Sequence, residues 1–165
     1  YSDSAISQIG IGTTAPKTKL DVHHNPTDLV NDTGGGEVVY FGTNSGDEGE
    51  ECVAGKLMYL HTDGVWYPPD ADAVATGGSQ LLGICLAGTV AAGGMLIRGF
   101  FDMRTYMNAD AGFVIGGPMY VDTTAGYITS TAPSGSGDYI RVVGYATTTA
   151  NVIYFNPDQT WVELT

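Results

Sequence analysis

Residues 55–66 read Gly-Lys-Leu-Met-Tyr-Leu-His-Thr-Asp-Gly-Val-Trp, and residues 117–128 read Gly-Pro-Met-Tyr-Val-Asp-Thr-Thr-Ala-Gly-Tyr-Ile. In each stretch a short apolar run is followed by a polar turn and then by a second apolar run. Asp63-Gly64 and Ala125-Gly126 stand at the turns, where glycine supplies the positive φ of a tight connection. The two stretches therefore predict two similar β-hairpins.

The likeness between these two stretches extends further along the chain. Residues 81–84 and 142–145 are matched apolar runs, each about 25 residues beyond the methionine of its hairpin. Residues 95–97 and 152–154 supply a third matched pair of runs. Equal spacing favours a duplicated unit whose two copies close on each other to bury their apolar faces. Accidental likeness between strand-rich segments is the alternative.

The composition agrees with a β protein. The 165 residues include 24 glycines and 7 prolines, which rule out long helices, because both residue types destabilise a helix interior. Turn residues separate ten short runs rich in β-branched and aromatic side chains. We expect an all-β fold, a compact barrel or sandwich, with strands at residues 37–41, 56–61, 65–67, 80–86, 95–101, 118–122, 127–131, 139–146, 152–156 and 160–164.

Residues 1–36 differ from residues 37–165. Their apolar side chains are scattered among polar and turn-forming residues, and the segment ends in three consecutive glycines. Such a segment does not close a core of its own. We expect an extended arm at residues 1–36 that lies on its own domain or on a neighbouring subunit, and a β domain at residues 37–165. The side chains expected to mediate assembly are Ile6, Ile9, Ile11, Leu20 and Val22.

The charge balance excludes two classes of partner. Eighteen acidic residues against six basic ones give a net charge of −12. Such a surface repels the phosphate backbone of nucleic acid and the anionic surface of membranes. No apolar run approaches the length of a membrane span. We therefore expect neither nucleic-acid binding nor membrane insertion.

Cys52 and Cys85 are too few for a disulfide framework. Cys85 lies in an apolar run, in which a small buried thiol is the ordinary expectation. A disulfide between the two cysteines is the alternative.

Two acidic segments contain possible cation ligands. Asp47, Glu48 and Glu50 lie on one flexible loop, where Ca²⁺ would find oxygen ligands, although the spacing is not that of an EF-hand and a solvated acidic loop is the usual explanation. Asp70 and Asp72 either chelate in the same way or cap a short turn before residue 74.

The remaining motifs do not favour catalysis. The adjacent His23 and His24 point to opposite faces of a strand, so they and His61 do not favour a zinc site. The glycine-containing segment 9–17 lacks the Gly-Lys-Ser/Thr and the helix of a phosphate-binding loop. No serine-nucleophile motif is present and neither cysteine lies in an activating setting. We expect a protein that is not an enzyme and has no cofactor.

Several aromatic and methionine side chains could either pack in the core or be exposed to a partner. Met103, Tyr106 and Met107 either protrude toward a partner or cap the core, and the second interpretation is favoured. The aromatic residues make up 10% of the chain and mostly fit core or interface packing, while stacking on a surface glycan is the alternative.

The segment from Ile9 to Val22 carries a resemblance to known proteins. Its pattern of Gly-Ile-Gly-Thr, a proline and then Leu-x-Val closely resembles a segment in bacteriophage tail fibres and related fibre-like surface proteins. The later Gly-containing hairpins and the closing residues 156–163 are similar to carboxy-terminal modules of phage fibres and to small β-rich capsid-decoration proteins.

The resemblance implies a structural subunit of a virion appendage or capsid decoration, found in virions or outside cells. Proteins of this kind self-associate, often as trimers, and contact other virion subunits. A subunit of a cellular extracellular filament that polymerises by strand donation is one alternative. A glycan-binding tip for host attachment is the other.

Overall fold

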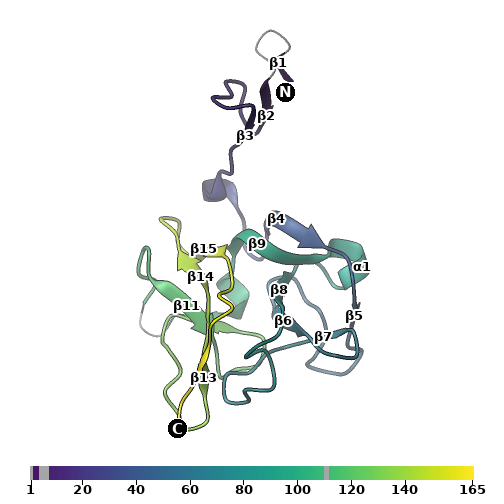
Figure 1. Cartoon of the computed structure of the whole chain (residues 1–165), viewed down its shortest axis with the longest axis vertical. Helices are drawn as coiled ribbons and strands as arrows, with labels where there is room; N and C mark the ends of the chain where they lie inside the picture. Colours follow the sequence, from purple (N-terminus) through teal and green to yellow (C-terminus); the bar gives the residue numbers. More distant parts are fainter. Residues whose placement is uncertain (1, 4–7, 110–111) are drawn as a thin grey trace.

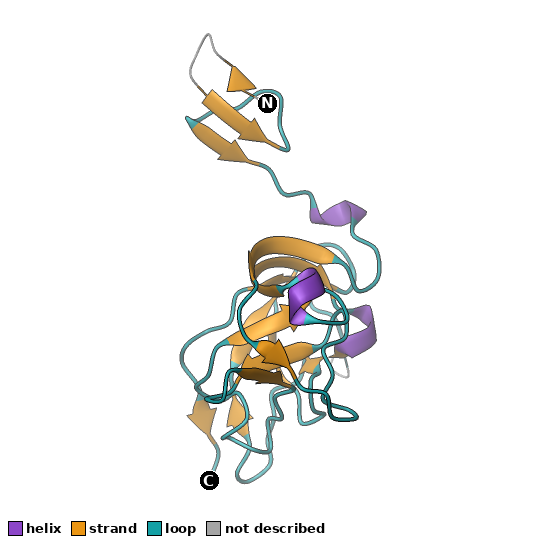
Figure 2. Cartoon of the chain, turned by 90° about the vertical axis from the view of Figure 1, so that its right-hand side faces the viewer, coloured by secondary structure: helices purple, strands orange, loops and turns teal. Residues whose placement is uncertain are grey.

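The structure is a computed structural model that describes residues 2–3, 8–109 and 112–165. Its described part contains three β-sheets and only short helical turns (Figures 1 and 2). The expectation of an all-β fold is therefore confirmed.

A small sheet at the amino terminus has the order β1-β2-β3. A two-stranded sheet pairs β13 with β16 near the carboxy terminus. The strands of these two sheets are β1 (Ser2–Asp3), β2 (Gln8–Ile11), β3 (Leu20–Val22), β13 (Tyr139–Ile140) and β16 (Val162–Glu163).

The large sheet has the order β10-β12-β11-β14-β15-β9-β8-β6-β7-β5, with β4 paired to β9 outside that path. Its strands are β4 (Gly34–Val39), β5 (Thr43–Asn44), β6 (Leu57–Leu60), β7 (Val65–Tyr67), β8 (Leu82–Cys85), β9 (Met95–Asp102), β10 (Met107–Asn108), β11 (Pro118–Val121), β12 (Ile128–Thr129), β14 (Val142–Ala146) and β15 (Val152–Phe155). The helical turns are η1 (Pro26–Asp28), α1 (Val90–Gly93) and η2 (Arg104–Tyr106).

The order of the large sheet reads alike from both ends. One half runs β12-β11-β14-β15, the other runs β7-β6-β8-β9, and β15 and β9 meet in antiparallel pairing. The register is also alike, because Met58 pairs with Gly83 and Met119 pairs with Gly144. Both hairpins form at the expected turns, with Gly64 and Gly126 at positive φ. This arrangement is the one that a duplicated unit predicts, and the duplication itself stays a prediction.

β9 is the strand at which the two halves part. On one side β4 pairs with it along nearly its whole length. On the other side, the pairing of β9 with β8 ends at Leu96 and its pairing with β15 begins at Gly99, so Ile97 and Arg98 have no register partner in either strand. The large sheet therefore splits at residues 97–98.

A barrel is not formed. The sheet has two ends, at β10 and β5, that do not pair with each other, so the expectation of a possible closed barrel is corrected. Short terminal strands of two residues each leave too little backbone for closure. One apolar core nevertheless joins both halves, with Leu57, Ile84 and Leu96 packed with Val121 and Val143.

A second, smaller core lies around Trp66 and Met95, and a disulfide joins Cys52 to Cys85 within it. The favoured expectation of a buried free thiol at Cys85 was therefore wrong. The two Cα atoms are 5.8 Å apart, within the usual range for a disulfide. The pairing was hidden in the sequence because the two cysteines are 33 positions apart, and only the fold brings them together.

The segment after β9 belongs to the core. Met103 is fully buried, and Tyr106 and Met107 pack against the same core. The favoured interpretation, that these residues cap the core, is confirmed. No helix in the described ranges 2–3, 8–109 and 112–165 is long and apolar enough to cross a bilayer.

Candidate functional site: the amino-terminal arm

The small amino-terminal sheet stands apart from the body of the molecule (Figure 1). A connection that includes η1 leads from it to β4, and β4 begins at Gly34. Residues 8–22 thus form strands of their own and do not lie on the β domain as a single extended strand. The segment before β4 is a projecting element with internal pairing, whereas Gly34, Gly35 and Gly36, expected at the end of the arm, pair with β9 in the body.

The arm displays one apolar face. β2 and β3 are parallel, and Ile9 pairs with Leu20 while Ile11 pairs with Val22. Because side chains alternate along a strand, these four residues share one side of the sheet, and Gly10 and Asp21 occupy the other. Their exposed fractions are 52% for Ile9, 62% for Leu20, 58% for Ile11 and 44% for Val22.

The loop between β2 and β3 explains the motif. Gly12 has a φ of +74°, and a Cβ atom on it would lie 2.5 Å from the main-chain oxygen of His23. The Lys17 amide donates to Asp21 Oδ2 over 2.8 Å, and the Thr18 hydroxyl donates to the Leu20 carbonyl over 2.6 Å. Pro16 is buried within the loop. These contacts return the chain to run parallel to β2, so the motif specifies a strand–loop–strand unit.

The base of the arm is fastened to the body. The Thr105 hydroxyl donates to Asp32 Oδ2 over 2.5 Å, and the Asp32 amide donates to the Asp102 carbonyl over 3.1 Å. Asn25 caps η1 by accepting a hydrogen bond from the Thr27 amide. The anchoring contacts lie between the arm and β4, so the apolar face of β2 and β3 remains uncovered.

Four of the five residues expected to mediate assembly are thus brought together. Ile6, the fifth, lies outside the described residues. The sequence indicated which residues are apolar, whereas their common face depends on the parallel register of β2 and β3.

The acidic loop is held by side chains of the body. The Ser45 hydroxyl donates to Glu50 Oε2 over 3.0 Å, and Lys56 Nζ donates to the Gly49 carbonyl over 2.5 Å. Burial lowers the pKa of Lys56, while nearby Glu51 and Glu50 oppose that shift. Asp47 and Glu48 are exposed. Calcium binding by Asp47, Glu48 and Glu50 stays a prediction, and the described ranges contain no group of three or more possible metal ligands.

The other polar candidates are dispersed. His23 Nε2 lies 3.2 Å from Asp21 Oδ1 in the arm, whereas His61 lies in the body beside the rings of Tyr59 and Tyr67. Asp70 Oδ1 accepts a hydrogen bond from the Asp72 amide, so this pair closes a turn, as the capping interpretation predicts.

Most of the aromatic side chains are in or against the cores. Tyr59, Trp66 and Tyr139 are buried, and Trp66 Nε1 donates to the Phe41 carbonyl over 2.9 Å. Tyr40 and Tyr145 are exposed, by 66% and 46%.

No family model, no curated protein and no solved structure matches this chain.

Proposed function

We propose that this protein is a structural subunit of a virion appendage or capsid decoration, of the phage-fibre type, and that it self-associates through its arm. The observation that carries the proposal is the uncovered face formed by Ile9, Ile11, Leu20 and Val22. Removing apolar surface from water is worth about 25 cal/mol per Å². Among the described residues no second layer covers this face of the arm sheet, so association between copies supplies the burial.

The apolar face of the arm binds the same face of other copies of this chain. Ten of the twelve net negative charges belong to residues 34–165, so the bodies repel one another. The arm projects from the body, which lets identical faces meet while the charged bodies stay apart (Figure 1). Three copies around one axis is the number that the fibre resemblance implies.

The disulfide supports a location on a virion or outside cells. Disulfides persist in oxidising surroundings such as the outside of cells and the surface of virions, and are rare in the cytosol. The Cys52–Cys85 bond therefore favours a virion or extracellular protein.

Sedimentation velocity on point variants of the whole chain tests the proposal. Ile11→Asp and Leu20→Asp place a charge on the apolar face, and each should weaken self-association at least about tenfold, equivalent to 1.4 kcal/mol. Thr14→Asp adds the same charge in the exposed loop beside the face and should assemble like the parent chain. Assembly that survives both face substitutions would refute the proposal, and open polymers in place of a closed oligomer would favour a filament subunit.

A further inference from the structure

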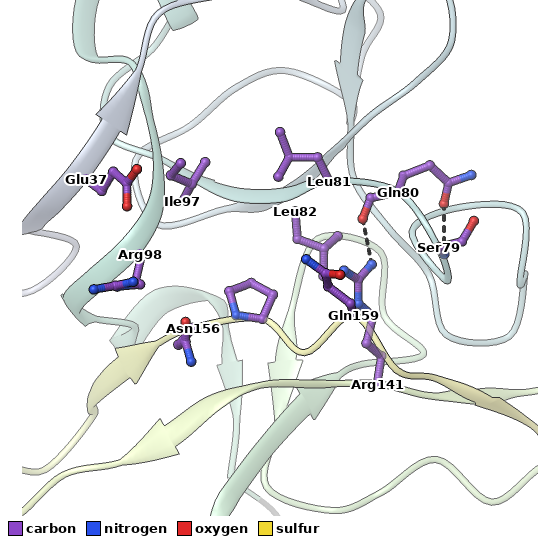
Figure 3. A pocket seen from close by; sticks show the side chains of 11 residues that line it. Glu37, Ser79, Gln80, Leu81, Leu82, Ile97, Arg98, Arg141, Asn156 and Gln159 are labelled. Carbon is purple, nitrogen blue, oxygen red and sulfur yellow. Dashed lines mark hydrogen bonds between the residues drawn. The ribbon is translucent and has the colours of Figure 1, made fainter.

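A cavity of about 490 Å³ opens on the body where the large sheet splits (Figure 3). Ile97, one of the two β9 residues without a partner in β8 or β15, forms part of its wall. Residues 79–82 line it from one half of the sheet, and Asn156, Pro157 and Gln159 line it from the other. The cavity is therefore a product of the junction between the halves and is separate from the arm.

Arg141 is the buried charge in this cavity, with only 4% of its surface exposed. Its Nε donates to the Asp158 carbonyl over 2.8 Å, and its Nη1 donates to the carbonyls of Gly77 and Gln80 over 2.6 and 2.7 Å. All three acceptors are neutral main-chain oxygens. Across the part of the chain that the structure describes, Nη2 makes no hydrogen bond and no carboxylate pairs with the guanidinium.

This arrangement is unusual for a buried cation. Charged groups in protein interiors are normally paired, because an unpaired charge loses its hydration without compensation. Burial lowers the pKa of Arg141, which reflects that cost. The nearby Asp158 carboxylate and Tyr139 oppose this pKa shift, but among the described residues no carboxylate forms an ion pair with the guanidinium, and Asp158 Oδ1 accepts a hydrogen bond from the Thr160 amide. The Arg141 guanidinium can therefore bind an anionic ligand.

The remaining lining defines the shape of a ligand. The exposed side chains of Gln159 and Asn156 present amide donors and acceptors, while Leu82 and Ile97 are apolar (Figure 3). The exposed Glu37 and Arg98, register partners on β4 and β9, add one charge of each sign to the lining. A hydroxylated ring offers both kinds of surface, hydroxyl groups for the amides and C–H groups for the apolar wall. The volume lies in the range of small-molecule sites, roughly 300–1,000 Å³.

We infer that this cavity binds the carboxylate of a small hydroxylated molecule, of the class of sugar acids. Arg141 Nη2 donates to the carboxylate in a charge-assisted hydrogen bond, and the amides of Gln159 and Asn156 bind hydroxyl groups. The net charge of −12 keeps polyanions away, so a ligand with a single carboxylate is favoured. The site adds small-molecule recognition to the structural function and does not depend on it.

Titration calorimetry of the full chain with sodium glucuronate tests this inference. Saturable binding with a dissociation constant on the order of 1 mM is expected, and the uncharged methyl ester and glucose should bind at least about tenfold more weakly. Arg141 also donates to three main-chain carbonyls, so replacing it would disturb the fold as well as the site. The deciding substitution is therefore at the exposed Gln159. Gln159→Glu places a negative charge in the cavity and should weaken glucuronate at least about tenfold. Thr148→Glu adds the same charge at an exposed position outside the cavity and should leave binding unchanged.

Three outcomes would overturn the inference. They are the absence of saturable glucuronate binding, equal affinity for glucose, and equal affinity for acetate, which has the carboxylate without hydroxyl groups. Leu20→Asp separates this site from the arm, since it should weaken self-association and leave glucuronate binding intact.

Discussion

At the scale of single residues, the Cys52–Cys85 disulfide fastens the acidic loop to the end of β8. It closes a segment of 33 residues, and the loss of chain entropy in the unfolded state predicts a stabilisation of about 3–4 kcal/mol. Replacing both cysteines with alanine should lower the free energy of unfolding in urea by that amount. Reduction of the parent protein should give a similar loss, and an unchanged urea midpoint in both experiments would contradict this role.

Asp70 predicts a dependence of stability on pH. Burial, with hydrogen bonding to Asp72 and nearby negative charge, raises the pKa of Asp70 to about 6, from an ordinary value of 3.8. The folded state therefore holds this proton more tightly than the unfolded state, so the contribution is favourable at low pH and is lost as the pH rises from about 4 to about 6.

Asp70→Asn keeps an acceptor for the Asp72 amide but cannot ionise. Its melting temperature relative to the parent chain should rise between pH 4 and pH 7. Asp47→Asn removes the same charge from an exposed loop and serves as the matched control. A Tm difference between Asp70→Asn and the parent that is constant across this range would show that Asp70 does not titrate as argued.

At the scale of elements, the close passage of β4 over β9 depends on glycine. A Cβ atom on Gly34 would collide with the main-chain oxygen of Phe100, whereas one on Gly35 would meet nothing within 4 Å. Gly34→Ala should therefore destabilise the protein by about 1–3 kcal/mol, as overpacking does, and Gly35→Ala should be nearly neutral. Equal effects of the two substitutions on chemical unfolding would show that contact with β9 does not decide the result.

Local pattern was sufficient to predict most of the body strands. The hairpin of β6 and β7 and the hairpin of β11 and β12 follow from short apolar runs on either side of a glycine turn. The parallel pair of β2 and β3 was missed, because an eight-residue loop without a hydrophobic period gives no local signal of parallel return. The internal sheet of the arm is therefore a tertiary property of the motif.

The site at Arg141 was missed for a related reason. A single arginine in the apolar run 139–146 was the available signal, since charged residues are almost never fully buried without partners. The surroundings of Arg141 come from residues 77–80 and 156–159. These two segments are distant in sequence and meet only where the sheet splits. The spacing of these residues gave no indication that they form one cavity.

At the scale of the whole molecule, a charged β body carries a projecting arm, and we propose that the arm mediates assembly. The body has a shared core and a disulfide of its own, and the anchoring contacts of Asp32 remain when the chain is shortened to residues 25–165. Light scattering coupled to gel filtration, on the full chain and on residues 25–165, decides whether the arm mediates assembly. We expect an oligomer for the full chain, with three protomers by the fibre resemblance, and a folded monomer for the shortened chain. A monomeric full chain, or an oligomer that persists without residues 1–24, would contradict it.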